Sequence, residues 1–330
     1  MSNVFIGTSG FAAAVLERMA RSEQRPSLVI TRPDRRSGRG RRLRPPPVAE
    51  RATGLGIPLA QPTSVNDPEA RDLIARAGRP SNDGEPARGD DGEGARQTLV
   101  VCAYGALIKE PLLSEHDILN VHPSLLPRWR GAAPVERALM AGDAETGVSI
   151  MRLTAGLDSG PVCLVGLEPI RPDDTYGSLA GRLQELGGEL IVRALEERPP
   201  FSEQPEEGVT YAEKITPEDR LLDPDRPAVE LERVVRALHP HIGARIALGD
   251  GTILGVQRAA VLDEDALGEA SGAGAAGEAL ESGGGVREQG GRLLLPTRDG
   301  VLELLEVQPP GGRPMDAAAY LRGYGPPGRR

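Results

Sequence analysis

Residues 98–122 read TLVVCAYGALIKEPLLSEHDILNVH, and this stretch decides the fold. It contains two apolar runs that predict strands, Thr98–Ala103 and Asp117–His122. Further out, Asn3–Gly7 and Leu28–Thr31 predict two more strands, and helical patterns separate them. Strands that alternate with helices favour an α/β fold with a mostly parallel sheet and helices on both faces. Such sheets bind ligands beyond the carboxyl ends of their strands.

The texture of the chain changes after a long amphipathic helix predicted at Thr175–Leu195. Proline and acidic residues gather over Arg198–Gly208, which indicates a connection between domains. We therefore expect an N-terminal catalytic domain over 1–204, a linker over 205–218 and a C-terminal domain over 219–330. In the last part a helix at Ala228–Leu238 precedes short strand candidates joined by turns, a pattern typical of a small β-barrel.

Two stretches rich in glycine and acid interrupt these patterns. The first, 78–97, predicts a disordered insertion in the α/β domain, and the second, 263–291, predicts a flexible insertion in the C-terminal domain. Neither contains enough large apolar residues to bury a face of its own.

The bulk composition is that of an ordinary soluble protein, with 39% hydrophobic and 26% charged residues among 330. No signal peptide or membrane span is recognisable. Cys102 and Cys163 lie in apolar runs, which favours reduced, inert thiols and a cytoplasmic location. The net charge of −9 argues against nucleic-acid binding, but residues 32–44 (RPDRRSGRGRRLR) hold seven arginines against one aspartate.

The densest segment for chemistry is 120–134, NVHPSLLPRWRGAAP. Asn120 and His122 lie two apart on a predicted strand, so their side chains leave by the same face. Pro123 then ends the strand and places both near its carboxyl end. Asp158 lies in a tight Gly-Leu-Asp-Ser-Gly loop that can carry a carboxylate close to another element. Taken singly, each of the three polar residues has an ordinary structural interpretation, a satisfied core side chain or a turn aspartate.

Together, these three residues suit acyl transfer to an amine. That reaction needs a base for the amine, donors for the developing oxyanion and a proton for the leaving nitrogen, and it needs no metal. Asn120 offers an amide donor, His122 a donor or a base, and Asp158 can orient or charge the imidazole. His239 and His241 have no cluster of Cys or Glu ligands near them in the sequence, so we predict no metal site there.

The segments quoted above resemble the 10-formyltetrahydrofolate-dependent formyltransferase family, most closely its members that formylate methionyl initiator tRNA. The resemblance covers nearly the whole chain outside the two insertions, and the strings that carry it are FIGTSGFA, TRPDRRSGRGRRL, VVCAYGALI, NVHPSLLPRWRGAAP, GDAETGVSIMRLTAGLDSGP and TYAEKI. It implies a doubly wound, Rossmann-like N-terminal domain and a C-terminal barrel similar to an oligonucleotide-binding (OB) fold. It implies 10-formyltetrahydrofolate as formyl donor and methionyl initiator tRNA as partner. Gly10 departs from the family, which often has aspartate there.

The resemblance also implies roles for particular residues. Asn120, His122 and Asp158 would be the catalytic trio. A turn of four residues would line the folate site: Ser124, Leu125, Leu126 and Pro127. A basic loop would engage the acceptor end of the tRNA, with Arg39 as its key residue, together with a lysine near the methionine; these residues are Arg35, Arg36, Arg39, Arg41, Arg42, Arg44 and Lys214. The ordinary interpretation of such a charge run is a solvated loop.

Three other functions fit parts of the sequence. A related formyltransferase could act on a small amine, but it would not need the arginine loop. A non-catalytic RNA-binding relative would not need an intact Asn120, His122 and Asp158. A dinucleotide-dependent dehydrogenase is suggested by Gly7 and Gly10 after the first strand, but the third glycine of the fingerprint is missing.

Overall fold

A computed structural model describes residues 3–37, 42–77, 97–262 and 285–327. Contacts between residues divide the chain into two compact units. The first comprises Met1–Pro134, Glu145–Pro169 and Ala180–Ala212, and the second comprises Val135–Ala144, Ile170–Leu179 and Glu213–Arg330. The second unit thus takes two short stretches from the middle of the sequence as well as its C-terminal part. Most of both predicted insertions lies outside the described residues.

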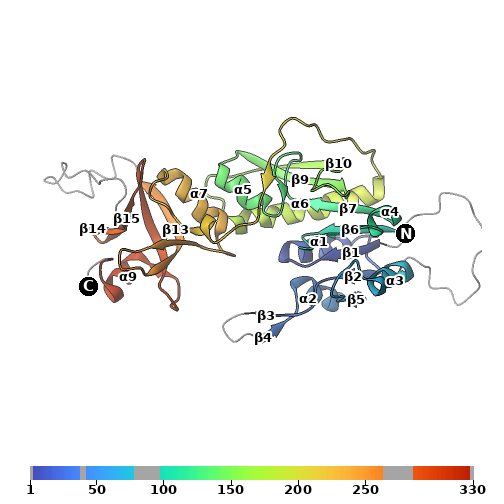
Figure 1. The fold of residues 1–330 in the computed structure, drawn as a ribbon, viewed down its shortest axis with the longest axis horizontal. Helices are drawn as coiled ribbons and strands as arrows, with labels where there is room; N and C mark the ends of the chain where they lie inside the picture. Colours follow the sequence, from blue (N-terminus) through green and yellow to red (C-terminus); the bar gives the residue numbers. More distant parts are fainter. Residues whose placement is uncertain (1–2, 38–41, 78–96, 263–284, 328–330) are drawn as a thin grey trace, which may run out of the picture. The chain divides into compact units, whose positions relative to one another are not determined.

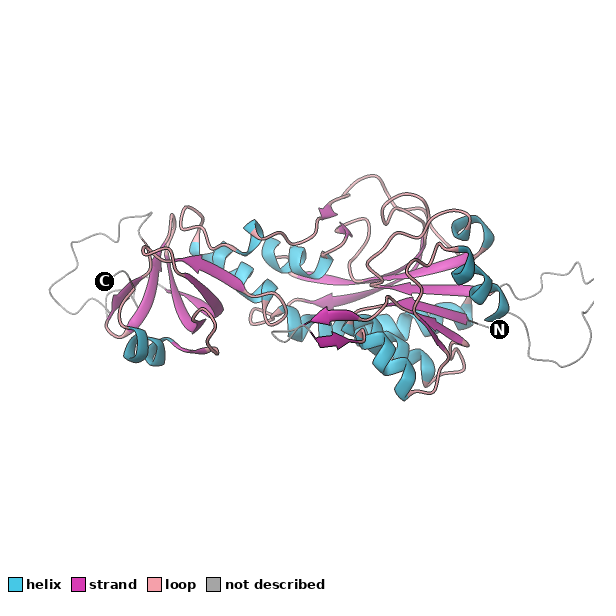
Figure 2. Cartoon of the chain, turned by 60° about the horizontal axis from the view of Figure 1, so that its bottom comes forward, coloured by secondary structure: helices cyan, strands magenta, loops and turns pink. Residues whose placement is uncertain are grey.

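The first unit is built on a seven-stranded sheet in the order β10-β9-β7-β6-β1-β2-β5 (Figures 1 and 2). The five strands from β7 to β5 are parallel, whereas β9 runs antiparallel to both β7 and β10. The mostly parallel α/β sheet expected from the sequence is therefore confirmed. Its strands are β1 (Asn3–Gly7), β2 (Leu28–Ile30), β5 (Leu59–Ala60), β6 (Thr98–Cys102), β7 (Asp117–His122), β9 (Glu145–Arg152) and β10 (Val162–Pro169).

Helices lie on both faces of this sheet, because its strands are apolar on both sides. The helices of this unit are α1 (Gly10–Ala20), α2 (Pro47–Gly54), α3 (Pro68–Ala77), α4 (Leu112–Glu115) and, from Ala180 on, α6 (Tyr176–Glu197). A further helix, α5 (Pro134–Ala141), belongs to the second unit from Val135 on. On one face, Val4 and Val101 pack in a cluster with Ile74 of α3 and Leu112 of α4. On the other, α6 packs so closely that a Cβ at Gly187 would lie 2.9 Å from Val121.

The alternation along β7 decides on which face the polar residues lie. Ile118 belongs to the cluster with α3 and α4, so Asn120 and His122, two and four residues later, lie on that same face. Val121 points the other way, toward α6. The catalytic candidates are therefore on the α3–α4 face, at the carboxyl end of β7.

Two small sheets accompany the large one. β8 (Arg130–Gly131) pairs in parallel with β11 (Tyr211–Ala212), and β3 (Arg35–Ser37) pairs antiparallel with β4 (Arg42–Arg44). The second pair corrects one expectation, because the arginine-rich segment predicted as a loop contains a hairpin. The first places a strand inside the segment 205–218 that was expected to be a linker.

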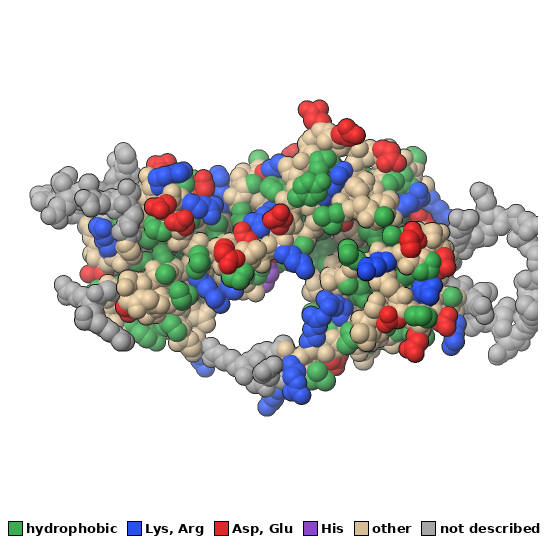
Figure 3. Space-filling model, viewed as in Figure 1, with side chains coloured by type: hydrophobic (Ala, Val, Ile, Leu, Met, Phe, Trp, Pro, Cys, Tyr) green, Lys and Arg blue, Asp and Glu red, His purple; other side chains and the backbone are tan. Residues whose placement is uncertain are grey.

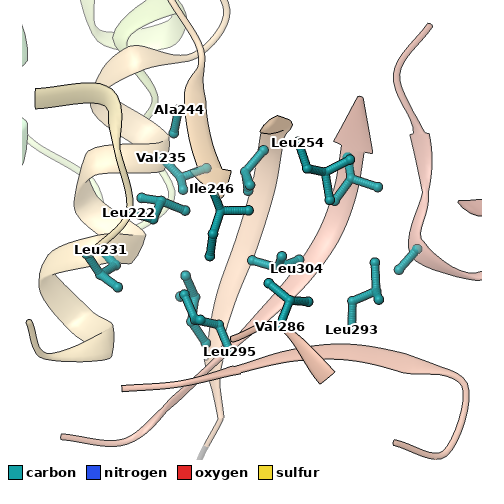
Figure 4. Close-up of a cluster of buried hydrophobic side chains, with 14 of the residues drawn as sticks. Leu222, Leu231, Val235, Ala244, Ile246, Leu254, Val286, Leu293, Leu295 and Leu304 are labelled. Carbon is teal, nitrogen blue, oxygen red and sulfur yellow. The ribbon is translucent and has the colours of Figure 1, made fainter. Parts of the chain in front are cut away.

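The second unit contains a six-stranded antiparallel sheet, β12-β13-β16-β15-β14, with β17 paired to β16. Leucine and valine side chains from the sheet and α7 form its core, among them Leu231, Val235, Leu254 and Leu304 (Figure 4). The elements are α7 (Ala228–Leu238), β12 (Ala244–Ala247), β13 (Ile253–Leu262), β14 (Arg287–Gln289), β15 (Arg292–Pro296), β16 (Val301–Gln308), β17 (Met315–Asp316) and α9 (Ala317–Tyr324), preceded by the 3₁₀ turn η1 (Glu218–Arg220).

This part of the chain confirms the predicted domain of short strands and the helix at Ala228–Leu238. One detail was wrong: the insertion expected over 263–291 includes β14, which pairs with β15 through Arg287 and Leu294. Within the described ranges, no helix is both long and apolar enough to cross a membrane.

Candidate functional site

Strand β7 presents the first two site residues. Asn120 is 8% and His122 is 4% exposed, although both are polar. Across the sheet, Asn120 pairs with Met151 and His122 with Ser149 of β9. Within the described part of the chain the Asn120 amide has no hydrogen-bond partner. The Asn120 amide is not among the fully buried unpaired side-chain groups of the described residues, so it is open to solvent or to a bound molecule.

One hydrogen bond fixes the tautomer of His122. Its Nε2 lies 2.9 Å from the carbonyl oxygen of Trp129. A carbonyl only accepts, so Nε2 carries the hydrogen and donates it. In the neutral ring the other nitrogen, Nδ1, then has a free lone pair. Nδ1 is the nitrogen that faces Asp158, 3.7 Å from its Oδ2. His122 is thus arranged to receive a proton on the side of the carboxylate.

Asp158 is held at this distance by its loop. Its φ is +43°, an unusual conformation for a residue with a side chain. The backbone N–H of Gly131 donates to Oδ2 over 2.8 Å. This donor needs glycine, because Gly131 has φ +123° and a Cβ there would lie 2.7 Å from the carbonyl oxygen of Ala212. The carboxylate thus lies 3.7 Å from Nδ1 of His122, on the side of the ring whose lone pair is free.

The turn expected to line the folate site follows β7 directly. Ser124 is fully buried, and its hydroxyl donates to the carbonyl oxygen of Arg128 over 2.6 Å. Ser149 holds the turn from β9: its hydroxyl donates to the Ser124 carbonyl oxygen over 2.8 Å and accepts from the Leu126 N–H over 3.1 Å. Ser124 therefore shapes the turn, while the half-buried Leu125, Leu126 and Pro127 present its apolar surface.

The arginine-rich hairpin is exposed, and basic side chains gather over it in Figure 3. Its register places Arg35 opposite Arg44 and Arg36 opposite Leu43, with Arg42 on the same face as Arg35 and Arg44. Like charges directly opposite one another destabilise a hairpin, so this arrangement suits a surface that meets a polyanion. Arg39 and Arg41, also expected to bind tRNA, lie outside the described residues.

Lys214, the remaining residue expected to bind tRNA, belongs to the second unit and is exposed. Its backbone is held in place there, because its carbonyl oxygen accepts from Arg137. Arg137 also makes a bidentate pair with Asp219, at 2.9 Å for each bond, and this pair lowers the pKa of Asp219.

Cys102, Cys163 and His241 are partly or fully buried or paired with another residue, and they take no part in the candidate site. Burial raises the pKa of the Cys102 and Cys163 thiols, which disfavours the reactive thiolate. His241 stacks on Tyr176 with ring centroids 3.6 Å apart and bonds to Glu136 over 2.9 Å. Over the described ranges, no three His, Cys, Asp or Glu side chains are grouped so as to hold a metal ion.

A groove of about 570 Å³ lies elsewhere in the first unit. It is lined by α1, α2 and α6, including Glu17, Glu50 and Glu185, and contains none of the site residues above. Because α6 packs against the face of the sheet opposite to His122, the groove is separate from the catalytic candidates.

The structure also adds residues that sequence reasoning missed. Gly131 supplies the hydrogen bond to Asp158, Trp129 supplies the carbonyl that orients His122, and Ser149 braces the turn. Gln204 bonds to the Asp158 loop. Trp129 and Gly131 both lie inside the segment 120–134, but nothing in the sequence indicated their hydrogen bonds to His122 and Asp158.

Two family models match the chain: "Formyl transferase" over residues 1–195 and "Formyl transferase, C-terminal domain" over 214–325. A protein of Halorhodospira halophila named methionyl-tRNA formyltransferase is 40% identical over 97% of this chain and 95% of its own length. One of Dechloromonas aromatica with the same name is 37% identical over 98% and 96%.

Solved structures agree in fold. A methionyl-tRNA formyltransferase from Clostridium thermocellum matches with a TM-score of 0.55 at 16% identity, over 79% of this chain and 94% of its own. A Helicobacter canadensis N-formyltransferase, solved with folinic acid and dTDP-3-aminofucose, matches with a TM-score of 0.61 at 13% identity, over 92% and 98%. On the family models and the full-length relatives, the chain belongs to the formyl transferase family.

Proposed function

We propose that this protein transfers a formyl group from 10-formyltetrahydrofolate to the α-amino group of methionyl initiator tRNA. The observation that carries the proposal is the buried cluster of Asn120, His122 and Asp158, with Nδ1 of His122 facing the Asp158 carboxylate at 3.7 Å. Relatives of nearly the same length, 37–40% identical, are named for methionyl-tRNA as their substrate. These names favour tRNA over the small amines that other proteins of this fold act on.

His122 acts as the base in this scheme. As the amine nitrogen bonds to the formyl carbon, it loses a proton, and the lone pair on Nδ1 of His122 accepts it. The resulting imidazolium lies beside the Asp158 carboxylate, which stabilises its charge. The same proton is then available for the nitrogen that leaves the formyl carbon. No covalent bond to the protein is needed.

Asn120 serves the formyl oxygen. Negative charge develops on that oxygen as the new C–N bond forms, and a preorganised N–H donor stabilises it. The Asn120 amide lies on the same face as His122, two residues earlier on β7. It can therefore donate to a formyl oxygen held beside His122.

The donor site would be formed by the turn after β7. When bound, 10-formyltetrahydrofolate supplies the formyl group. Leu125, Leu126 and Pro127 offer an apolar surface for its ring system, and the free amide of Asn120 offers a polar partner next to it. Ser124 would act indirectly, by holding the shape of the turn.

The arginine hairpin would grip the acceptor stem. Arg35, Arg42 and Arg44 share one face, and arginine binds phosphate through two parallel N–H donors. Arg36 faces the other way, with the exposed Leu43 opposite it. Arg39, Arg41 and Lys214 complete the set expected to contact tRNA, and residues 219–330 would also bind its backbone. Because these interactions are with phosphates, binding should weaken steeply with salt.

The test measures formyl transfer from 10-formyltetrahydrofolate to methionyl initiator tRNA, elongator methionyl-tRNA and free methionine. We expect strong preference for the initiator and loss of activity in His122→Ala. His116→Ala is the matched control, because His116 lies before β7, outside the site, and should leave the rate unchanged. Near-normal activity of His122→Ala would refute the assignment of the base. Transfer to a small amine but to no tRNA would refute the substrate.

A further inference from the structure

The segment from Ser202 to Ala212, here called the crossing segment, is hydrogen-bonded to the loops that carry Trp129 and Asp158. Its backbone pairs with Val162 at one end and with the residues after Trp129 at the other. Thr210 accepts from the Trp129 N–H through its hydroxyl and from the Arg130 N–H through its carbonyl, both over 2.9 Å. The crossing segment is therefore part of the frame of the site in the first unit.

One side chain of this segment, Gln204, uses both ends of its amide. Its NH₂ group donates to the carbonyl oxygens of Asp158 over 2.9 Å and of Gly160 over 2.7 Å. Its oxygen accepts from Nε and Nη2 of Arg130, over 3.0 and 2.7 Å. An amide has two N–H donors and two acceptor lone pairs, so these four bonds use its full capacity.

These bonds connect the loop that carries Asp158 with the strand β8, whose Gly131 N–H binds the Asp158 carboxylate. Gln204 holds the backbone of Asp158 directly, in the left-handed conformation that a side-chain-bearing residue adopts only under constraint. Through Arg130 it also holds the strand whose next residue, Gly131, donates to the Asp158 carboxylate. The position of that carboxylate relative to His122 is thus fixed from both sides by one residue.

We propose that Gln204 is a positioning residue for formyl transfer, which keeps the Asp158 carboxylate at its working distance from Nδ1 of His122. The proposal rests on the proposed function, since it requires that Asp158 acts with His122. It also explains why a glutamine is needed. A glutamate could still accept from Arg130, but its carboxylate could not donate to the two carbonyl oxygens.

The decisive variant is Gln204→Glu in the full chain, because it removes the donors and keeps the acceptor. A misplaced carboxylate weakens the step that forms the imidazolium, so we expect kcat to fall by about 10- to 100-fold. The KM values for 10-formyltetrahydrofolate and tRNA should stay unchanged, since Gln204 touches neither the folate turn nor the hairpin. Gln97→Glu is the matched control. Gln97 donates to the Ile74 carbonyl oxygen before the amino end of β6, away from the site.

A double-mutant cycle separates positioning from a general structural role. If Gln204 acts through Asp158, then Gln204→Glu causes no further loss in an Asp158→Ala background, measured by single turnover at excess enzyme. Independent, additive losses would overturn the proposal, as would a normal kcat in Gln204→Glu. Should Gln204→Glu fail to fold, the uncharged Gln204→Met variant is tested for the same two results.

The outcome for Asp158 keeps the two proposals apart. Absence of formyl transfer to any tRNA by the wild-type protein would overturn the proposed function. Full activity of Asp158→Ala would leave that function standing but overturn the role of Asp158, and with it the role of Gln204. Loss of activity in Asp158→Ala together with a normal Gln204→Glu enzyme would overturn the role of Gln204 alone.

Discussion

Replacing Gly131 with alanine should damage both the stability of the first unit and the catalytic rate. Gly131 has φ +123°, a conformation almost reserved for glycine, and an alanine there costs roughly 1–3 kcal/mol. The added Cβ would lie 2.7 Å from the Ala212 carbonyl oxygen, a backbone atom that cannot rotate away. Overpacking of this kind costs about 1–3 kcal/mol more. The free energy of unfolding should therefore fall by roughly 2–6 kcal/mol.

The protein offers its own probe for this measurement. Trp129 is the only tryptophan of the chain and lies two residues from Gly131, so its fluorescence during urea unfolding reports on the first unit. Gly56→Ala is the matched control: Gly56 has φ +64° but nothing within 4 Å of a Cβ, so it carries the conformational cost alone. Equal losses in the two variants would refute the close approach to Ala212. An unchanged kcat in Gly131→Ala would refute the role of its N–H toward Asp158.

Three further predictions concern the turn, the second unit and the hairpin. Ser149→Ala leaves two backbone groups of the turn proposed to bind folate unpaired, so it should cost about 1–3 kcal/mol of stability and raise the KM for 10-formyltetrahydrofolate. An unchanged KM would contradict this. The pair with Arg137 lowers the pKa of Asp219 in the folded protein below its ordinary value of 3.8. The pair therefore stabilises the folded second unit at pH values above 3.8, and this stabilisation is lost as the pH falls through the pKa of Asp219 in the folded state. Amide hydrogen exchange in α7 should accordingly be faster in Arg137→Met than in the wild type at neutral pH. The difference between the two exchange rates should shrink on acidification. Arg35→Gln with Arg44→Gln should flatten the plot of log K for tRNA against log salt by about one unit for each arginine–phosphate pair removed, whereas a weaker binding that ignores salt would count against phosphate recognition.

The sequence predicts those elements that bury a face. The run DILNVH at Asp117–His122 and the helix at Ala228–Leu238 coincide with β7 and α7, because their apolar residues repeat at the period of the element. Among the strands that were missed are β3, β4 and β11. β3 and β4 are short and charged, β4 is exposed throughout, and β11 has only two residues. Such strands leave no hydrophobic period to detect.

The same distinction holds for the site. Asn120 and His122 could be proposed from the sequence because they lie two apart on a single predicted strand, and Asp158 because its loop is flanked by glycines. Gln204 and Gly131 could not, because their roles come from hydrogen bonds to residues 46 and 27 positions away from them. The proline and acidic residues around Gln204 predicted only a connection between domains. The composition of a connecting segment does not reveal which loops its side chains contact.

The discontinuous second unit has a consequence for synthesis on the ribosome. Glu136 and Arg137 of α5 belong to that unit, but their partners His241 and Asp219 follow 105 and 82 residues later. At translation rates of about 5–20 residues per second, α5 waits roughly 4–20 s for these partners to be made. During this interval Val135 and Leu139, both buried in the finished protein, emerge before the rest of their unit exists. The second unit can therefore close only as the chain nears completion.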